Sequence, residues 1–204
     1  MVGVYGPRQS ERKMGFSEQG RINCDVKLAS FATRQRGKFG QSAEEREYSS
    51  IMQTALEAAA QLSSFPKAVV DVYCLVLEAG GSELAVAITT ASLALADAGV
   101  ELTDLVAACS VSLALGNLLL DPSSDEAFRE EAGMLLAMMP TANEVTHLVA
   151  RGPWADAQLR EGLELCMGGC LQLDGAMRQC LKEAAAAKQQ QRQQQLQQHP
   201  AGGS

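Results

Sequence analysis

The stretch from residue 68 to residue 99 constrains the fold of this 204-residue chain more than any other. Residues 68–78 are apolar and rich in β-branched side chains, the pattern of a buried strand, and the pair Gly80-Gly81 follows them. Residues 84–98 are apolar on every side and end at Gly99, which predicts a buried helix with a glycine C-cap. A buried helix next to a strand needs a sheet to cover, so the chain must fold in layers of sheet and helix.

The N-terminal part adds two strands and a helix. Residues 2–5 read as the end of a strand that Gly6-Pro7 breaks, and apolar and polar residues alternate over 21–32 as in a half-buried strand. Ser42 with Glu45 three positions later predicts a capping box for a helix that runs to about Leu62.

The C-terminal part adds three strands and a long helix. Residues 106–115 predict a strand, and residues 134–149 predict a hairpin around Pro140. An amphipathic helix is predicted from Trp154 to about Lys188, followed by a Gln-dominated tail that we expect to be frayed helix or disordered. The order of elements predicts an α+β fold with one domain over residues 1–187 and a tail over 188–204.

The charge of the chain is unevenly distributed. Residues 1–40 hold eight Lys or Arg against three Asp or Glu, a net charge of +5, so the remaining residues carry −12 of the total of −7. Such a split indicates a region that faces a polyanion on an otherwise acidic body.

Several classes of function are excluded. No apolar run reaches the roughly 18 residues that a membrane span needs, and the N-terminus lacks a signal peptide. The six cysteines contain no Cys-x-x-Cys pair, and His147 and His199 are far apart and away from ligand spacing. We therefore expect no metal, no cofactor and no membrane partner.

Residues 77–100 carry a family resemblance. The sequence Leu-Glu-Ala-Gly-Gly-Ser-Glu, followed by an Ala-rich helix that ends in Ala-Asp-Ala-Gly, resembles the core motif of the RNase PH family, which reads Leu-x-Ala-Asp-Gly-Gly-Thr-Arg. Matching segments recur in order at residues 6–8, 118–122 and 138–140. The chain most resembles the ring subunits of the eukaryotic RNA exosome within this family. The resemblance implies an RNase PH-like domain with a β-α-β-α core like that of ribosomal protein S5 domain 2, from which the N-terminal strands are missing.

The phosphate site that the resemblance implies is degenerate here. Phosphorolysis needs arginines that hold and aim phosphate. Glu83 stands where active relatives have the arginine of Gly-Gly-Thr-Arg, and Glu45-Arg46-Glu47 stands where they have Arg-Arg-Glu. One arginine is retained and two positions, Glu45 and Glu83, reverse their charge.

The acidic site is also altered. An ungapped alignment puts Ala127 and Gly133 where active members of the family have a spaced pair of aspartates, although a shift in register would bring Asp125 or Glu126 near. We predict a chain with no catalytic residues.

The resemblance implies a structural ring subunit that supports 3′-to-5′ RNA processing and degradation, including rRNA maturation. Its implied partners are other RNase PH-like subunits in a six-membered ring, S1/KH cap subunits and RNA, in the nucleus, nucleolus and cytoplasm. Arg34, Arg36 and Lys38 are interleaved with Phe31 and Phe39, so this loop could line the RNA path; the other interpretation is a solvated loop that aids solubility. Arg46 is a further candidate for RNA contact. The alternative functions are an active phosphate-dependent 3′–5′ exoribonuclease and a free-standing RNA-binding module.

Overall fold

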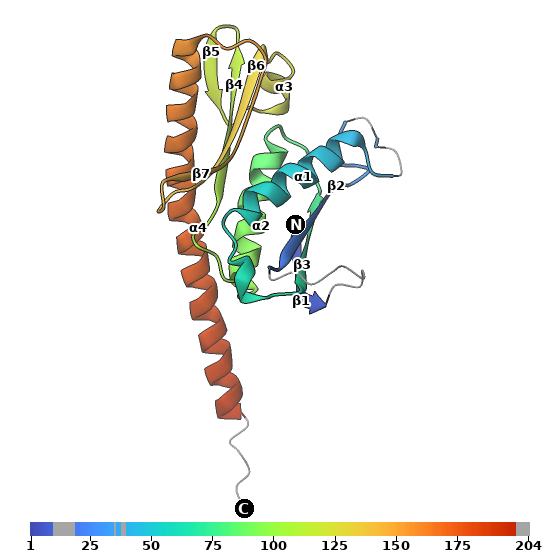
Figure 1. Ribbon diagram of the computed structural model, residues 1–204, viewed down its shortest axis with the longest axis vertical. Helices are drawn as coiled ribbons and strands as arrows, with labels where there is room; N and C mark the ends of the chain where they lie inside the picture. The colour runs from blue at the N-terminus through green and yellow to red at the C-terminus, as the bar shows by residue number, and fades with distance from the viewer. Residues whose placement is uncertain (10–18, 35, 38–39, 199–204) are drawn as a thin grey trace, which may run out of the picture.

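A computed structural model describes residues 1–9, 19–34, 36–37 and 40–198. The described elements are strands and helices in mixed order, and the strands form two separate sheets (Figure 1). In chain order they are β1 (Val2–Gln9), β2 (Arg21–Leu28), α1 (Ala43–Glu57), the short 3-10 helix η1 (Leu62–Ser64), β3 (Ala68–Val76), α2 (Glu83–Asp97), β4 (Ala107–Ala114), β5 (Asn117–Leu120), α3 (Ser124–Ala127), β6 (Ala132–Met139), β7 (Glu144–Arg151) and α4 (Asp156–Gln198).

The first sheet has the order β1-β3-β2. β1 runs antiparallel to β3, whereas β2 runs parallel to it, because helix α1 carries the chain back between β2 and β3. Buried side chains of this sheet, among them Ile22, Val70 and Val72, pack with buried residues of α1 and α2 in one hydrophobic core.

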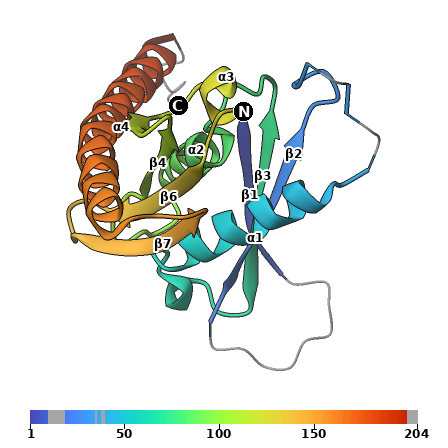
Figure 2. The same cartoon turned by 90° about the horizontal axis from the view of Figure 1, so that it is seen from above.

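The second sheet is antiparallel, with the order β5-β4-β6-β7. Its strand β6 is buried on both faces: Leu135 and Ala137 belong to the core shared with α1 and α2, whereas Met134 and Leu136 belong to a second core beneath α4. Helices α1 and α2 thus lie between the two sheets, and α4 covers the outer face of the second sheet (Figure 2).

The α+β fold is confirmed, but some predicted boundaries were wrong. β1 does not end before Gly6 and Pro7. Its register on β3 shifts between Tyr5 and Arg8, but pairing resumes at Arg8, so the strand continues to Gln9. Helix α1 keeps its capping box but ends at Glu57. Helix α4 extends to Gln198, ten residues beyond the predicted end of its amphipathic part, and projects from the body of the molecule (Figure 1).

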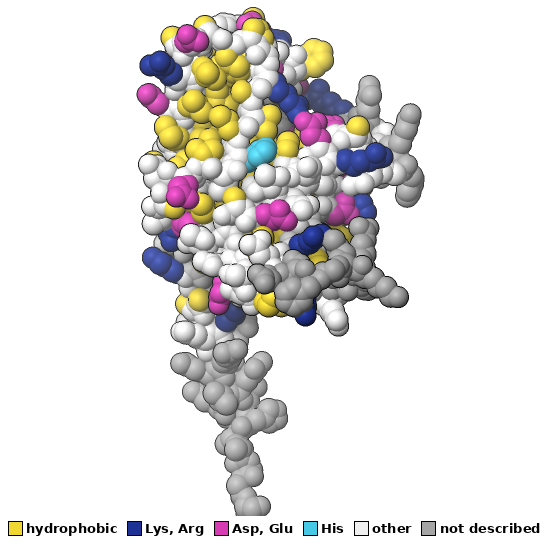
Figure 3. Space-filling view, viewed as in Figure 1, with side chains coloured by type: hydrophobic (Ala, Val, Ile, Leu, Met, Phe, Trp, Pro, Cys, Tyr) yellow, Lys and Arg dark blue, Asp and Glu magenta, His cyan; other side chains and the backbone are white. Residues whose placement is uncertain are grey.

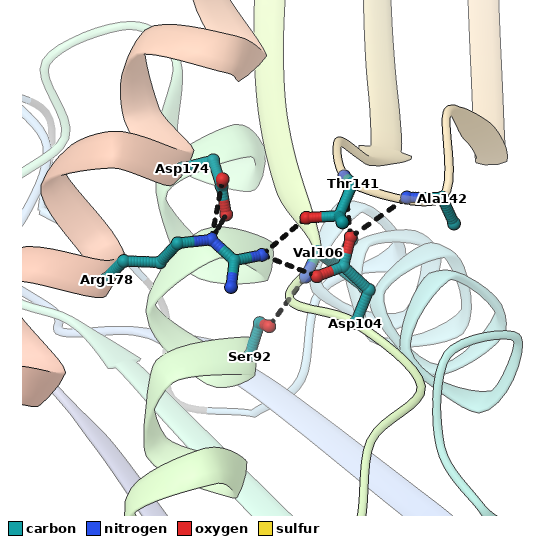
Figure 4. A network of polar contacts seen from close by, with 7 residues as sticks. All are labelled: Ser92, Asp104, Val106, Thr141, Ala142, Asp174 and Arg178. Atoms are coloured by element: carbon teal, nitrogen blue, oxygen red, sulfur yellow. Dashed lines mark hydrogen bonds and ion pairs between the residues drawn. The ribbon is translucent and has the colours of Figure 1, made fainter.

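Helix α4 is attached to the second sheet by a polar network as well as by its core contacts (Figure 4). Arg178 is ion-paired with Asp174 one turn earlier on α4 and with Asp104 in the loop before β4. The same guanidinium donates to the hydroxyl of Thr141 in the turn between β6 and β7. Three segments far apart in the sequence are held together at this point.

Candidate functional site

Glu83 lies at the centre of the candidate site. It is the first residue of α2, and its carboxylate accepts a hydrogen bond of 2.9 Å from the backbone N–H of Gly81. Gly81 has φ +137°, and a Cβ there would lie 2.1 Å from the carbonyl oxygen of Pro122, so this turn requires glycine. The helix N-terminus, which attracts anions, thus already carries a carboxylate of its own chain.

A cleft of about 160 Å³ opens beside Glu83, between α2, α1 and the second sheet. Ser110 of β4 donates to the hydroxyl of Ser82 across 2.7 Å, and Ser112 of the same strand donates to the carboxylate of Glu130 across 2.7 Å. Glu83 and Glu130 both line the cleft. Two carboxylates line this cleft, and negative charge of this kind repels an anion such as phosphate.

Glu130 is a residue that the sequence interpretation missed. A Cβ placed on Gly133 would lie only 2.2 Å from the Oε1 atom of Glu130, so this carboxylate occupies the space over the glycine. The signal in the sequence was Gly133, a glycine three positions after Glu130 that leaves room for the carboxylate. Asp125 and Glu126, the two acids that a shifted alignment would bring to the acidic site, do not line the cleft. Asp125 is exposed and ion-paired with Arg34, and Glu126 accepts hydrogen bonds from Ser123.

Glu45 holds helix α1 in place and does not line the cleft. It is buried, and its carboxylate accepts backbone N–H bonds from Leu28 and Ser42 at 2.8 and 2.6 Å. Burial by itself raises the pKa of Glu45, but these hydrogen bonds outweigh it and hold the pKa below its usual value. Glu45 caps α1 and ties it to β2. Among the described residues that line the cleft, α1 contributes Tyr48 and Ile51 instead.

None of the described residues that were predicted to bind RNA lines this cleft. Arg34 lines a wider hollow of about 1250 Å³ together with Phe31, whereas Arg36 and Arg46 are simply exposed. Arg46 donates to the carbonyl oxygen of Gln41 at 3.4 Å. Lys38 and Phe39 lie outside the described residues.

The wider hollow contains a second aromatic side chain that the sequence interpretation missed. Phe128, at the end of α3, is 91% exposed, and Phe31 on the other wall is 73% exposed. Arg129 adds a second guanidinium, while Glu78, Glu83 and Asp125 add carboxylates, so Glu83 lines both the cleft and the hollow. The hollow therefore offers stacking surfaces and hydrogen-bond donors, with mixed charge.

The described part of the chain offers neither a cluster of metal ligands nor a membrane-spanning helix. No group of three or more His, Cys, Asp or Glu residues there is placed to hold a metal ion. None of the described helices has the length and apolarity needed to cross a membrane. The six cysteines are free thiols, four of them buried.

The chain is similar to exosome subunits in sequence and in fold. It is 42% identical over 185 residues to an exosome complex component RRP41-like from Arabidopsis thaliana, a match that covers 91% of this chain and 71% of the relative. It is 41% identical over 206 residues to the human exosome complex component MTR3, covering 91% and 74%. Its fold matches the crystal structure of rice Rrp46 with a TM-score of 0.76 at 23% identity, over 88% of this chain and 82% of that one.

The two halves of the chain match consecutive domains of one family. Residues 1–101 match domain 1 of the 3′ exoribonuclease family, RNase PH, and residues 104–169 match domain 2. The boundary between them lies in the loop between α2 and β4, where the chain passes to the second sheet. The order of the two domains, the fold and the identity to its relatives together show that this chain belongs to the RNase PH family.

Proposed function

We propose that this chain is a non-catalytic ring subunit of an RNA exosome that supports 3′-to-5′ RNA processing and degradation, including rRNA maturation. Similarity to proteins named as exosome components supports the assembly. The observation that carries the non-catalytic assignment is the carboxylate of Glu83, which closes the turn at the N-terminus of α2.

The cleft lacks the means to hold a phosphate nucleophile. A multiply charged anion must be held by cations and N–H donors that are not already engaged. Here the N–H of Gly81 donates to Glu83, and the guanidinium of Arg151, which also lines the cleft, is ion-paired with Glu47. Glu83 and Glu130 add negative charge to the cleft.

The proposed role is therefore scaffolding. The partners are other RNase PH-like subunits in a six-membered ring, S1/KH cap subunits and the RNA that passes through the ring. The proposed locations are the nucleus, the nucleolus and the cytoplasm, where RNA is processed and degraded.

Affinity purification of the tagged full chain from cells tests the assembly. We expect other exosome subunits to be recovered with it. Recovery of RNA without them would contradict the ring assignment and favour a free-standing RNA-binding module.

A phosphorolysis assay tests the absence of catalysis. Incubated with single-stranded RNA and phosphate, the purified chain should release no nucleoside diphosphates, alone or with its recovered partners. Phosphate-dependent release that Glu130→Gln abolishes would instead assign catalysis to this cleft.

The wider hollow is the proposed contact with RNA. Exposed aromatic rings stack on bases, and arginines pair with phosphates and stack on bases. Ultraviolet crosslinking of the recovered complex to single-stranded RNA should weaken with Phe31→Ala, Phe128→Ala or Arg34→Ala. Arg160→Ala, which changes an exposed arginine of α4 outside the hollow, is the matched control. Equal crosslinking in all four variants would contradict this contact.

A further inference from the structure

Ser124 is an exposed serine at the start of α3, on the wall of the wider hollow. Its hydroxyl makes a long contact of 3.5 Å with the carbonyl oxygen of Ala79, which is a weak hydrogen bond at best. The hydroxyl of the neighbouring Ser123 is held more firmly, because it donates to the carboxylate of Glu126 across 2.7 Å and caps α3. Ser124 therefore carries the more accessible hydroxyl of this pair.

The residues that follow Ser124 are acidic and easily displaced. Asp125 and Glu126 come directly after it, and both are exposed. Carboxylates in these positions are complementary to a kinase whose substrate groove is basic, which we call an acid-directed kinase. Helix α3 is a single turn of four residues, none of them buried, so it can be drawn into an active site at little cost. Ser42 also precedes acids, but it caps the fifteen-residue helix α1, whose buried face holds it in place.

Two arginines share the hollow with Ser124. Arg34 and Arg129 line it together with three carboxylates. Arg34 is ion-paired with Asp125, the residue after Ser124, so its guanidinium reaches this part of α3. Figure 3 shows basic, acidic and hydrophobic side chains close together on the surface where α3 lies in Figure 1. A phosphate on Ser124 would thus find guanidinium partners within its own hollow.

We propose that Ser124 is a phosphorylation site, at which an acid-directed serine/threonine kinase controls the access of RNA to the wider hollow. The Oγ atom of Ser124 forms a bond to the γ-phosphorus of ATP, and the bond from that phosphorus to the departing ADP breaks. The hydroxyl proton passes to the catalytic base of the kinase. The control of RNA rests on the proposed contact between the hollow and RNA, whereas the modification itself does not.

The added phosphate acts on the hollow in two ways. It carries a charge of about −1.5 to −2 at pH 7 and three acceptor oxygens, so it competes with RNA phosphates for Arg34 and Arg129. It also adds to three carboxylates that already outnumber the two guanidiniums, so the hollow repels the RNA backbone more strongly. Phosphorylation should therefore weaken the contact with RNA while Phe31 and Phe128 stay exposed.

Treatment of the purified full chain with an acid-directed kinase and ATP tests the site. Mass spectrometry should detect a phosphorylated chain, and fragmentation of its peptides should place a phosphoryl group on Ser124. Ser124→Ala should remove that group. Ser50→Ala is the matched control and should leave it unchanged, because Ser50 is exposed but is followed by Ile51 and Met52 instead of acids. A chain that takes up no phosphate, or takes it up only at other residues, would overturn the proposal.

Ultraviolet crosslinking tests the effect on RNA. In the complex recovered from cells, Ser124→Asp places a negative charge in the hollow, and crosslinking of this chain to single-stranded RNA should fall about fivefold. Ser50→Asp, which adds the same charge outside the hollow, should leave crosslinking unchanged. Equal crosslinking of the wild type and Ser124→Asp would overturn the control of RNA by this residue.

The two experiments separate this proposal from the proposed function. Phosphorylation of Ser124 is measured on the chain alone and depends neither on exosome subunits nor on RNA. A wild type that is phosphorylated at Ser124 but never crosslinks to RNA would contradict the RNA contact of the hollow, and the modification site would stand.

Discussion

Arg178 donates from Nη2 to the Oδ1 atom of Asp104 across 2.7 Å, and this contact joins α4 to the loop where the chain enters the second sheet. The side chain of Asp104 is only 8% exposed. Its other oxygen, Oδ2, accepts N–H bonds from Thr141 and Ala142, at 2.8 and 3.3 Å. One buried carboxylate therefore organises the start of β4, the β6–β7 turn and α4 (Figure 4).

Removal of the guanidinium should destabilise the fold. Arg178→Ala leaves Asp104 with its backbone donors but without its ion pair, so we expect a loss of about 1–2 kcal/mol in the free energy of unfolding. Urea denaturation followed by circular dichroism measures it. Arg160→Ala, at an exposed arginine on the same helix, should change stability by much less. Equal effects of the two changes would show that the network is not stabilising.

Stability should fall in acid because of two carboxylates. Burial alone raises the pKa of Asp104, but hydrogen bonds from Thr141, Leu105, Arg178 and Ala142 lower it, and the pKa of Glu45 is lowered in the same way. A lowered folded-state pKa stabilises the protein fully above the unfolded value of about 4. That stabilisation is lost as pH falls through the folded-state pKa.

Urea unfolding at a series of acidic pH values measures this dependence. Asp104→Asn and Glu45→Gln should each flatten it, whatever their effect on stability at neutral pH. Asp156→Asn, at an exposed residue that begins α4, is the control. If the two buried-site variants keep the wild-type slope, these carboxylates do not cause the acid sensitivity.

The buried thiols beneath α4 should be unreactive in the folded protein. Burial, together with the neighbouring Cys109, raises the pKa of Cys166 and of Cys170 to about 12, so the reactive thiolate is scarce at pH 8. We expect Ellman's reagent to modify the exposed Cys180 rapidly and Cys166 and Cys170 only after urea is added. Mass spectrometry of the modified peptides identifies the sites, and rapid labelling of Cys166 in native buffer would contradict the packing.

Phosphate should not stabilise the wild-type chain. In Glu83→Arg, the charge at the N-terminus of α2 is reversed and an anion could bind, so added phosphate should raise the melting temperature by about 2–4 °C. Glu161→Arg, on the exposed side of α4, makes the same change of charge elsewhere and should show no such rise. Stabilisation of the wild type by phosphate would contradict our interpretation of Glu83.

Local patterns in the sequence were sufficient for most of the fold. The apolar strand, the Gly80-Gly81 turn and the apolar helix are where the sequence predicted them, although the helix is buried on one side only and Val86 is exposed. The capping box of Ser42 and Glu45 was equally readable, because both partners lie within one helical turn. Irregular features could not be predicted in this way. β1 continues through Gly6 and Pro7 because β3 pairs with it on both sides of the register shift between Tyr5 and Arg8.

The roles of the carboxylates required the tertiary structure. Glu45 and Glu83 look alike in the sequence, as acids at positions where the family resemblance implies arginines, yet one caps a helix and ties it to β2, and the other closes the turn before α2. Glu130 reaches the cleft only because Gly133 leaves room above its strand. The sequence by itself thus determined most of the elements and the family, but it did not predict the short strand β5 or the short helix α3. The tertiary structure decided which charges meet and which strands pair, because these depend on contacts between segments that no local period records.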